Sequence, residues 1–144
     1  MTYEIRPCRA DEVGQILKLL DRCGLVYAPC DNETNISNKI KSDPQSILVS
    51  LHLSSVIGVI FLIRDPWASL TYHLCVHEDY RRRGVARALL IAAEEYIGEI
   101  SNNVGGYAIE TNNAVLKLKK SLGYSIYPQR LILTNKTLEK ERRR

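Results

Sequence analysis

The sequence predicts a single α+β domain built on a mostly antiparallel sheet. The chain has 144 residues, a common length for one domain with one substantial core. Strand-like runs alternate with stretches whose apolar residues recur at helical spacing. Three consecutive strand-like runs are joined by connections too short for a crossover helix. These observations together favour an α+β architecture.

The N-terminal third is expected to contain one strand and one or two helices. Residues 3–7 alternate between polar and apolar and end in proline, which indicates a short strand. The apolar residues of the segment 13–20 recur three or four positions apart, which predicts an amphipathic helix. Residues 21–45 mix glycine and prolines with polar residues, and only Ile36 and Ile40 hint at a second helix.

The middle of the chain predicts three successive antiparallel strands. Residues 47–53 and 56–63 are rich in β-branched and other apolar side chains and are separated by two serines, which indicates a hairpin. An Asp-Pro turn then leads into a third strand-like run at 68–77.

The second half predicts two helices separated by a short strand. Residues 85–100 carry the clearest apolar stripe of the sequence. A short strand is expected at 107–111. Asn112 or Asn113 then caps a helix that ends at Gly123, a residue type that favours the C′ position.

The remaining features define the domain and its setting. A last strand is expected at about 125–134, and residues 139–144 form a frayed basic tail of the single domain 1–144. No apolar run approaches the roughly 20 residues of a membrane helix, and the N-terminus lacks a signal-peptide pattern. We therefore expect a cytoplasmic protein with no membrane partner. A homodimer is compatible with the sequence.

Four cysteines are spaced irregularly in a chain large enough to fold without disulfides. We expect all four to be reduced thiols. These are Cys8, Cys23, Cys30 and Cys75.

The segment Arg81–Ala86 lies between the third of these strands and the best-patterned helix. The first backbone N–H groups of a helix have no intrahelical acceptor, and the positive end of the helix dipole lies there. A glycine at position 84 lets a phosphate approach the backbone closely. This junction predicts a binding site for the pyrophosphate of a nucleotide cofactor.

The segment Val76–Leu90 resembles the acetyl-CoA signature of the GNAT-type N-acetyltransferase superfamily, whose core is Gln/Arg-x-x-Gly-x-Gly/Ala. Arg81, Gly84 and Ala86 fill the three defined positions. The order of the predicted elements also agrees, so the resemblance covers nearly the whole chain. It implies a three-layer fold, with a mixed sheet of six or seven strands, helices on both faces, and fourth and fifth strands that splay apart.

The resemblance also implies how acetyl-CoA is bound. Backbone N–H groups of about Arg82 to Arg87 would hold the pyrophosphate, and arginine side chains would add charge-assisted contacts. The backbone of Leu74–Val76 would pair with the pantetheine arm, which Asn112 would also reach. The predicted cofactor-binding residues are Leu74, Cys75, Val76, Arg81, Arg82, Arg83, Gly84, Val85, Ala86, Arg87, Asn112 and Lys119.

The family reaction is direct transfer, in which an amine attacks the thioester carbonyl and a backbone N–H near Val76 stabilises the oxyanion. The position of the usual tyrosine acid is Lys119 here, and Tyr107 replaces the glutamate base of ribosomal-protein N-terminal acetyltransferases. Our hypothesis is that Glu110 or Tyr107 helps to deprotonate the amine through water. Lys119 would then lie near the sulfur or a phosphate. An exposed strand end explains Glu110 equally well.

A binding module, nucleic-acid binding and a metal site are the alternatives to acetyl transfer. A CoA-binding module or sensor without transferase activity is the main alternative, because the usual acid and base are replaced. The net charge of +4 and the scattered tyrosines give little support for nucleic-acid binding. The run His73-x-Cys75-x-His77 places three metal-ligand types on one face of a strand, with Tyr72 on the other. It lacks a fourth ligand, so we expect no metal.

The acceptor pocket in this family is built largely from the region 21–45 and the edge of the final strand. Tyr27, Asp31 and Glu33 are candidates for attracting a cationic amine. The acceptor could be a protein α-amine, a lysine, an aminoglycoside-like amine or a small metabolite.

Overall fold

The computed structural model describes residues 1–108, 112–127 and 134–138. Two compact units divide the chain, Met1–Tyr107 and Ala108–Arg144, and each is described by itself. The first unit contains the sheet and three α-helices. The described part of the second contains one helix, α4. The elements in chain order are β1 (Glu4–Pro7), the 3-10 helix η1 (Ala10–Glu12), α1 (Val13–Arg22), α2 (Glu33–Ser42), β2 (Ile47–His52), β3 (Ser55–Ile63), β4 (Ser69–Val76), the 3-10 helix η2 (Glu78–Tyr80), α3 (Val85–Gly98), β5 (Val104–Gly106) and α4 (Asn113–Ser121).

The first unit is built on a mixed sheet with the strand order β1-β2-β3-β4-β5. β1 to β4 pair antiparallel, as the short connections predict, and β5 pairs parallel to β4. Leu53 and Ser54 join β2 to β3, and both have positive φ, as a type I′ hairpin turn requires.

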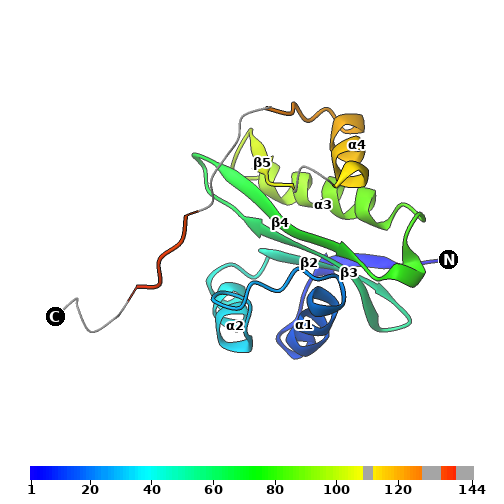
Figure 1. Ribbon diagram of the computed structural model, residues 1–144, viewed down its shortest axis with the longest axis vertical. Helices are drawn as coiled ribbons and strands as arrows, with labels where there is room; N and C mark the ends of the chain where they lie inside the picture. The colour runs from blue at the N-terminus through cyan, green and yellow to red at the C-terminus, as the bar shows by residue number, and fades with distance from the viewer. Residues whose placement is uncertain (109–111, 128–133, 139–144) are drawn as a thin grey trace. The chain divides into compact units, whose positions relative to one another are not determined.

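Helices cover both faces of this sheet, α1 and α2 on one face and α3 on the other (Figure 1). The α1/α2 face buries the stripe predicted from sequence, with Ile16 and Leu20 fully enclosed against Val49 and Val59 of the central strands. The opposite face packs α3 through Leu89, which is also fully buried. No helix in the described ranges is long and apolar enough to cross a membrane.

β5 lies earlier in the chain than the sequence pattern suggested. β5 is Val104–Gly106; of the strand expected at 107–111, Tyr107 and Ala108 are not in a strand, and 109–111 lie outside the described residues. The glycines misled the prediction because they usually weaken strands. Here Gly105 is needed, since Leu70 of β4 packs 3.0 Å from the position that a Cβ would take.

Several other boundaries can be compared with expectation. The hint of a helix around Ile36 and Ile40 is confirmed as α2, which Asn32 caps by accepting a hydrogen bond from the Asn35 N–H. Of the last expected strand, 125–127 are not in a strand and 128–133 lie outside the described residues. The predicted tail, 139–144, also lies outside them.

The expectation of four free thiols is wrong for two of them. Cys23 and Cys75 form a disulfide across 52 residues, with their Cα atoms 6.5 Å apart. Cysteine spacing could not reveal this pair, because only the tertiary packing of α1 on β4 brings the end of the helix next to the strand. Cys8 and Cys30 are free thiols, as expected.

Candidate functional site

The turn before α3 has the backbone geometry of an anion site. Arg82 and Gly84 both adopt left-handed conformations, with φ of 59° and 82°. Gly84 is the N-cap of α3, and the first helical hydrogen bond runs from the Ala88 N–H to the Gly84 carbonyl. By helix geometry the N–H groups of Val85 and Ala86 therefore have no intrahelical acceptor. These donors fit a pyrophosphate.

Arg81 ties this turn to the end of β4. Its Nε donates a hydrogen bond of 2.9 Å to the Val76 carbonyl, and its Nη2 lies 3.8 Å from the sulfur of Cys23. The Arg81 side chain thus connects the turn to the end of β4 in this structure. Arg82 and Arg83 are exposed on the turn.

The second half of β4 has an open edge next to this turn. β5 pairs only with Ser69, Leu70 and Thr71 of β4. Within the described residues, no strand pairs with Leu74–Val76 on that side, while β3 pairs with Cys75 and Val76 on the other. An open strand edge offers backbone N–H and C=O groups to an extended ligand. β5 thus pairs with β4 only along the first three residues of β4.

A bulge in β4 changes which side chains share a face. Phe61 pairs with Tyr72 and Val59 with Cys75, so β4 has one more residue than β3 across this interval. His73 absorbs the extra residue with a left-handed φ of 49°. The strict alternation assumed from sequence is wrong here. Tyr72 packs on the core cluster that includes Cys75, rather than on the opposite face.

The bulge brings His73 next to Asp31, which lies between α1 and α2. The His73 Nε2 is 2.7 Å from the Asp31 Oδ2, and this oxygen also accepts a 2.8 Å hydrogen bond from the Tyr27 N–H. The Asp31 side chain is only 5% exposed, whereas that of His73 is 22% exposed. In the sequence, His73 stands out as a candidate metal ligand and Asp31 as a candidate to attract an amine, so the two are separate features there. No local signal pairs them, because the contact joins residues 42 positions apart.

The three candidate metal ligands of the run His73-x-Cys75-x-His77 each have another partner. His73 is bound to Asp31, Cys75 is in the disulfide, and His77 accepts a hydrogen bond from the Asp79 N–H. Among the described residues, no group of three or more His, Cys, Asp or Glu side chains is placed to hold a metal ion.

Of the two predicted catalytic residues, only Tyr107 lies within the described residues. Its side chain is exposed, and its ring stacks on that of Tyr72 with centroids 6.0 Å apart. Burial and the neighbouring Tyr107 raise the pKa of Tyr72. Glu110 lies outside the described residues.

The second unit contains two predicted site residues. Asn112 caps α4 as expected, with its side chain accepting a hydrogen bond from the Val115 N–H at 3.2 Å. Gly123 follows the helix with the positive φ predicted for a C′ residue. Lys119 is buried, and its Nζ lies 5.6 Å from the centre of the Tyr124 ring. Burial lowers the pKa of the Lys119 ammonium.

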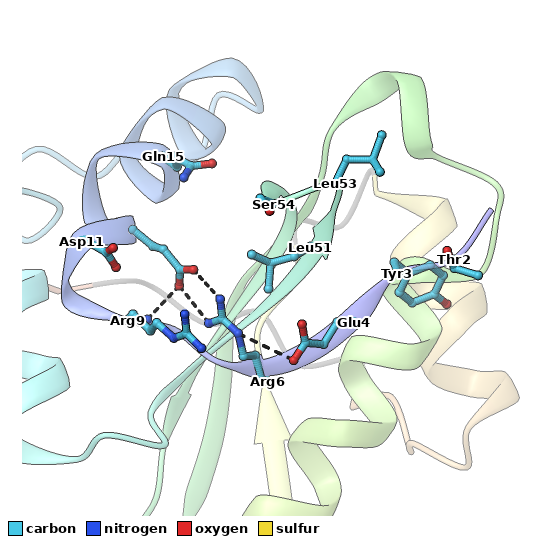
Figure 2. Close-up of a pocket in the computed structure, with 11 residues that line it drawn as sticks. Thr2, Tyr3, Glu4, Arg6, Arg9, Asp11, Gln15, Leu51, Leu53 and Ser54 are labelled. Atoms are coloured by element: carbon cyan, nitrogen blue, oxygen red, sulfur yellow. Dashed lines mark hydrogen bonds and ion pairs between the residues drawn. The ribbon is translucent and has the colours of Figure 1, made fainter.

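A separate pocket of about 640 Å³ lies against β1 and the start of α1 (Figure 2). Charged groups dominate it, and they largely neutralise one another. Arg6 donates two hydrogen bonds to Glu12, which also accepts one from the Arg9 N–H. None of the predicted site residues lines this pocket. Its ion pairs connect β1 to η1, which is a structural role.

Comparison with known proteins identifies the family of this fold. Residues 43–126 match the acetyltransferase (GNAT) domain. An acetyltransferase of Sodalis glossinidius is 31% identical over 137 residues, which cover 94% of this chain and 96% of that protein. Ard1 from Thermoplasma volcanium shares the fold with a TM-score of 0.77 at 21% identity, over 88% of this chain and 85% of its own. The PaiA N-acetyltransferase from Thermoplasma acidophilum, solved with coenzyme A, has a TM-score of 0.76 at 16% identity, over 90% and 94%.

Proposed function

This chain belongs to the GNAT family of acetyltransferases, and we propose that it transfers the acetyl group of acetyl-CoA to a primary amine by direct attack in a ternary complex. The observation that carries this proposal is the open edge of β4, which leads through Arg81 into the left-handed turn at Gly84. The two features together suit a ligand with an extended amide-containing arm and a diphosphate.

The open edge is proposed to bind the pantetheine arm. The backbone groups of Leu74–Val76 would pair with its amides as a strand would. The Val76 carbonyl is already used by Arg81, so this guanidinium holds the turn at a fixed place relative to the strand. We propose that this connection aligns the arm site with the phosphate site.

The turn is proposed to bind the pyrophosphate. The N–H groups of Val85 and Ala86 supply donors at the positive end of the α3 dipole, and the exposed Arg82 and Arg83 add positive charge. A Cβ on Gly84 would meet no protein atom within 4 Å. The space beside Gly84 is therefore open to a phosphate.

Roles for the remaining predicted residues stay proposals. Asn112 would contact the pantetheine arm, and Lys119 would lie near the sulfur or a phosphate. Tyr107 or Glu110 would help to deprotonate the amine through water. The role expected for Asp31 in attracting the amine changes. Asp31 is too buried to act as a surface attractor of a cationic amine, whereas Glu33 is exposed at the start of α2.

Replacing Gly84 tests the cofactor site. In Gly84→Asp a carboxylate would face the diphosphate, and like-charge contacts cost several kcal/mol, so acetyl-CoA affinity should fall by about a hundredfold or more in calorimetry. Aspartate tolerates positive φ better than most residues, so the fold should persist. Gly24→Asp is the matched control, because Gly24 also has positive φ and open space around it. Unchanged affinity in Gly84→Asp would refute the site.

Release of the CoA thiol tests the reaction. Candidate acceptors are an alanyl peptide, an N-acetylated peptide with one lysine, kanamycin and 1,4-diaminobutane. Thiol release that depends on one of these amines, with the acetylated product seen by mass spectrometry, is the expected result. Tight acetyl-CoA binding without turnover on any of the four would contradict amine transfer and favour a binding module.

A further inference from the structure

The Asp31–His73 pair has no role in the cofactor site, yet it adjoins that site in the chain. His73 directly precedes Leu74–Val76, the open edge proposed for the pantetheine arm. Asp31 lies in the segment between α1 and α2, which is distant in sequence. The pair therefore joins the segment expected to form the acceptor pocket to the strand expected to hold the thioester.

The backbone at His73 is unfavourable for a histidine. A left-handed conformation is uncommon for residues other than glycine, although histidine adopts it more often than most. Here it occurs in the middle of a strand, where the β4 register changes. Such conformations persist only where the surroundings enforce them, and they concentrate at functional sites. At His73 the surroundings are the Phe61 ring, edge-on at 5.0 Å, and the Asp31 carboxylate.

The pair fixes which ring nitrogen can act as a base. An ionised carboxylate only accepts hydrogen bonds, so Asp31 accepts from Nε2–H of His73 as well as from the Tyr27 N–H. In the neutral ring the lone pair is then on Nδ1. The titratable group in contact with this ring is Asp31, and β3 contributes the apolar Phe61. Tyr72, the neighbour of His73 in the chain, stacks on Tyr107.

We infer that His73, rather than Tyr107 or Glu110, is the general base that deprotonates the acceptor amine, with Asp31 as its positioning residue. This inference rests on the proposed acetyl transfer. Nδ1 takes one proton from the ammonium, and the freed nitrogen lone pair forms the C–N bond to the thioester carbonyl carbon. The C–S bond breaks, and its electron pair leaves with the thiolate. The new amide nitrogen releases its second proton to solvent, and the thiolate is protonated from solvent or the imidazolium, so that one proton is released overall.

Kinetics of the most active of the four amines test the inference. His73→Asn removes the imidazole but keeps a side chain that tolerates positive φ. At pH 7 its kcat/KM should fall by about 10² to 10³, the range for general base catalysis, with unchanged acetyl-CoA affinity. The deficit should narrow as the pH rises toward the pKa of the amine itself, because the free amine then needs no base. Added imidazole should restore part of the rate.

Two further variants make the result specific. Asp31→Asn should lower kcat/KM by a smaller factor, since it leaves the ring but loses its fixed tautomer. His52→Asn is the matched control. His52 lies at the end of β2 and is hydrogen-bonded to the Thr2 carbonyl, so the kcat/KM of this variant should not change. The inference is overturned if His73→Asn stays within twofold of the wild type, or if its deficit is constant with pH. If His73→Asn does not fold, wild-type kinetics and pH profile in Asp31→Asn overturn it. Absence of turnover in the wild type would instead refute the proposed transfer itself.

Discussion

Gly58→Ala should destabilise the protein and weaken acetyl-CoA binding. Gly58 lies on β3 beneath the first turns of α3. A Cβ there would be 3.0 Å from the Leu89 Cδ1, 3.2 Å from the Val85 Cγ1 and 3.4 Å from the Cys75 carbonyl oxygen. The first two distances require α3 side chains to move by a few tenths of an ångström.

The expected magnitude follows from two opposing effects. Adding a methylene-sized group to a close-packed core costs about 1–3 kcal/mol. Replacing glycine by alanine recovers about 0.4–1 kcal/mol, because the unfolded chain loses freedom. The net loss is then about 1–2 kcal/mol, or a fall in Tm of about 3–8 °C for a domain of this size. Val85 is the first residue of α3, so displacing it also disturbs the turn at Gly84.

Urea unfolding and acetyl-CoA calorimetry measure the two effects. Gly14→Ala is the control, because a Cβ at Gly14 in α1 meets nothing within 4 Å. That variant should gain about 0.5–1 kcal/mol from helix propensity and bind acetyl-CoA normally. If Gly58→Ala were as stable as Gly14→Ala, the packing argument would be refuted. If it were destabilised but bound acetyl-CoA normally, only the link to the turn would fail.

Two further predictions concern cross-links in the first unit. Arg64 donates two hydrogen bonds to Asp43 and holds the pKa of that carboxyl below its usual value. The pair therefore stabilises the fold above the unfolded pKa, at about pH 4. This contribution is lost as the pH falls through the lower pKa of the folded state. Urea unfolding of Arg64→Met across pH should show a lower free energy of unfolding at neutral pH and a shallower loss on acidification; an unchanged acid limb would contradict this. Reducing the Cys23–Cys75 disulfide, which spans 52 residues, should lower the free energy of unfolding by about 4 kcal/mol in the chain-entropy model. Urea unfolding with and without reductant measures this loss. The control is a Cys75→Ser variant, which should be equally stable in both conditions. A wild type insensitive to reductant would mean that the disulfide does not stabilise the fold.

The helices and turns that the sequence predicted correctly depend on residues close together in the chain. The α1 and α3 stripes, the hairpin between β2 and β3 and the Asn112 cap all depend on spacings of two to four residues. Such signals survive folding because the same short-range geometry applies in every fold. The turn at Gly84 belongs to this group, because the glycine and the start of α3 are neighbours in the sequence.

The errors came from contacts between distant segments. The strand at Val104–Gly106 was missed because the pattern could not show Leu70 packing on Gly105. Tyr72 was assigned to the wrong face because one bulge residue reverses the alternation of a strand. The Cys23–Cys75 disulfide likewise required α1 to meet β4.

The sequence by itself determined the family resemblance, the element order of the first unit and the phosphate turn, since each is encoded in short-range spacing and residue type. Only the tertiary structure decided the open edge of β4, the role of Arg81 at Val76 and the pairing of His73 with Asp31. The physical reason is that a strand edge and a buried hydrogen bond are properties of two segments at once. Their geometry exists only after the sheet has closed against α1 and α2.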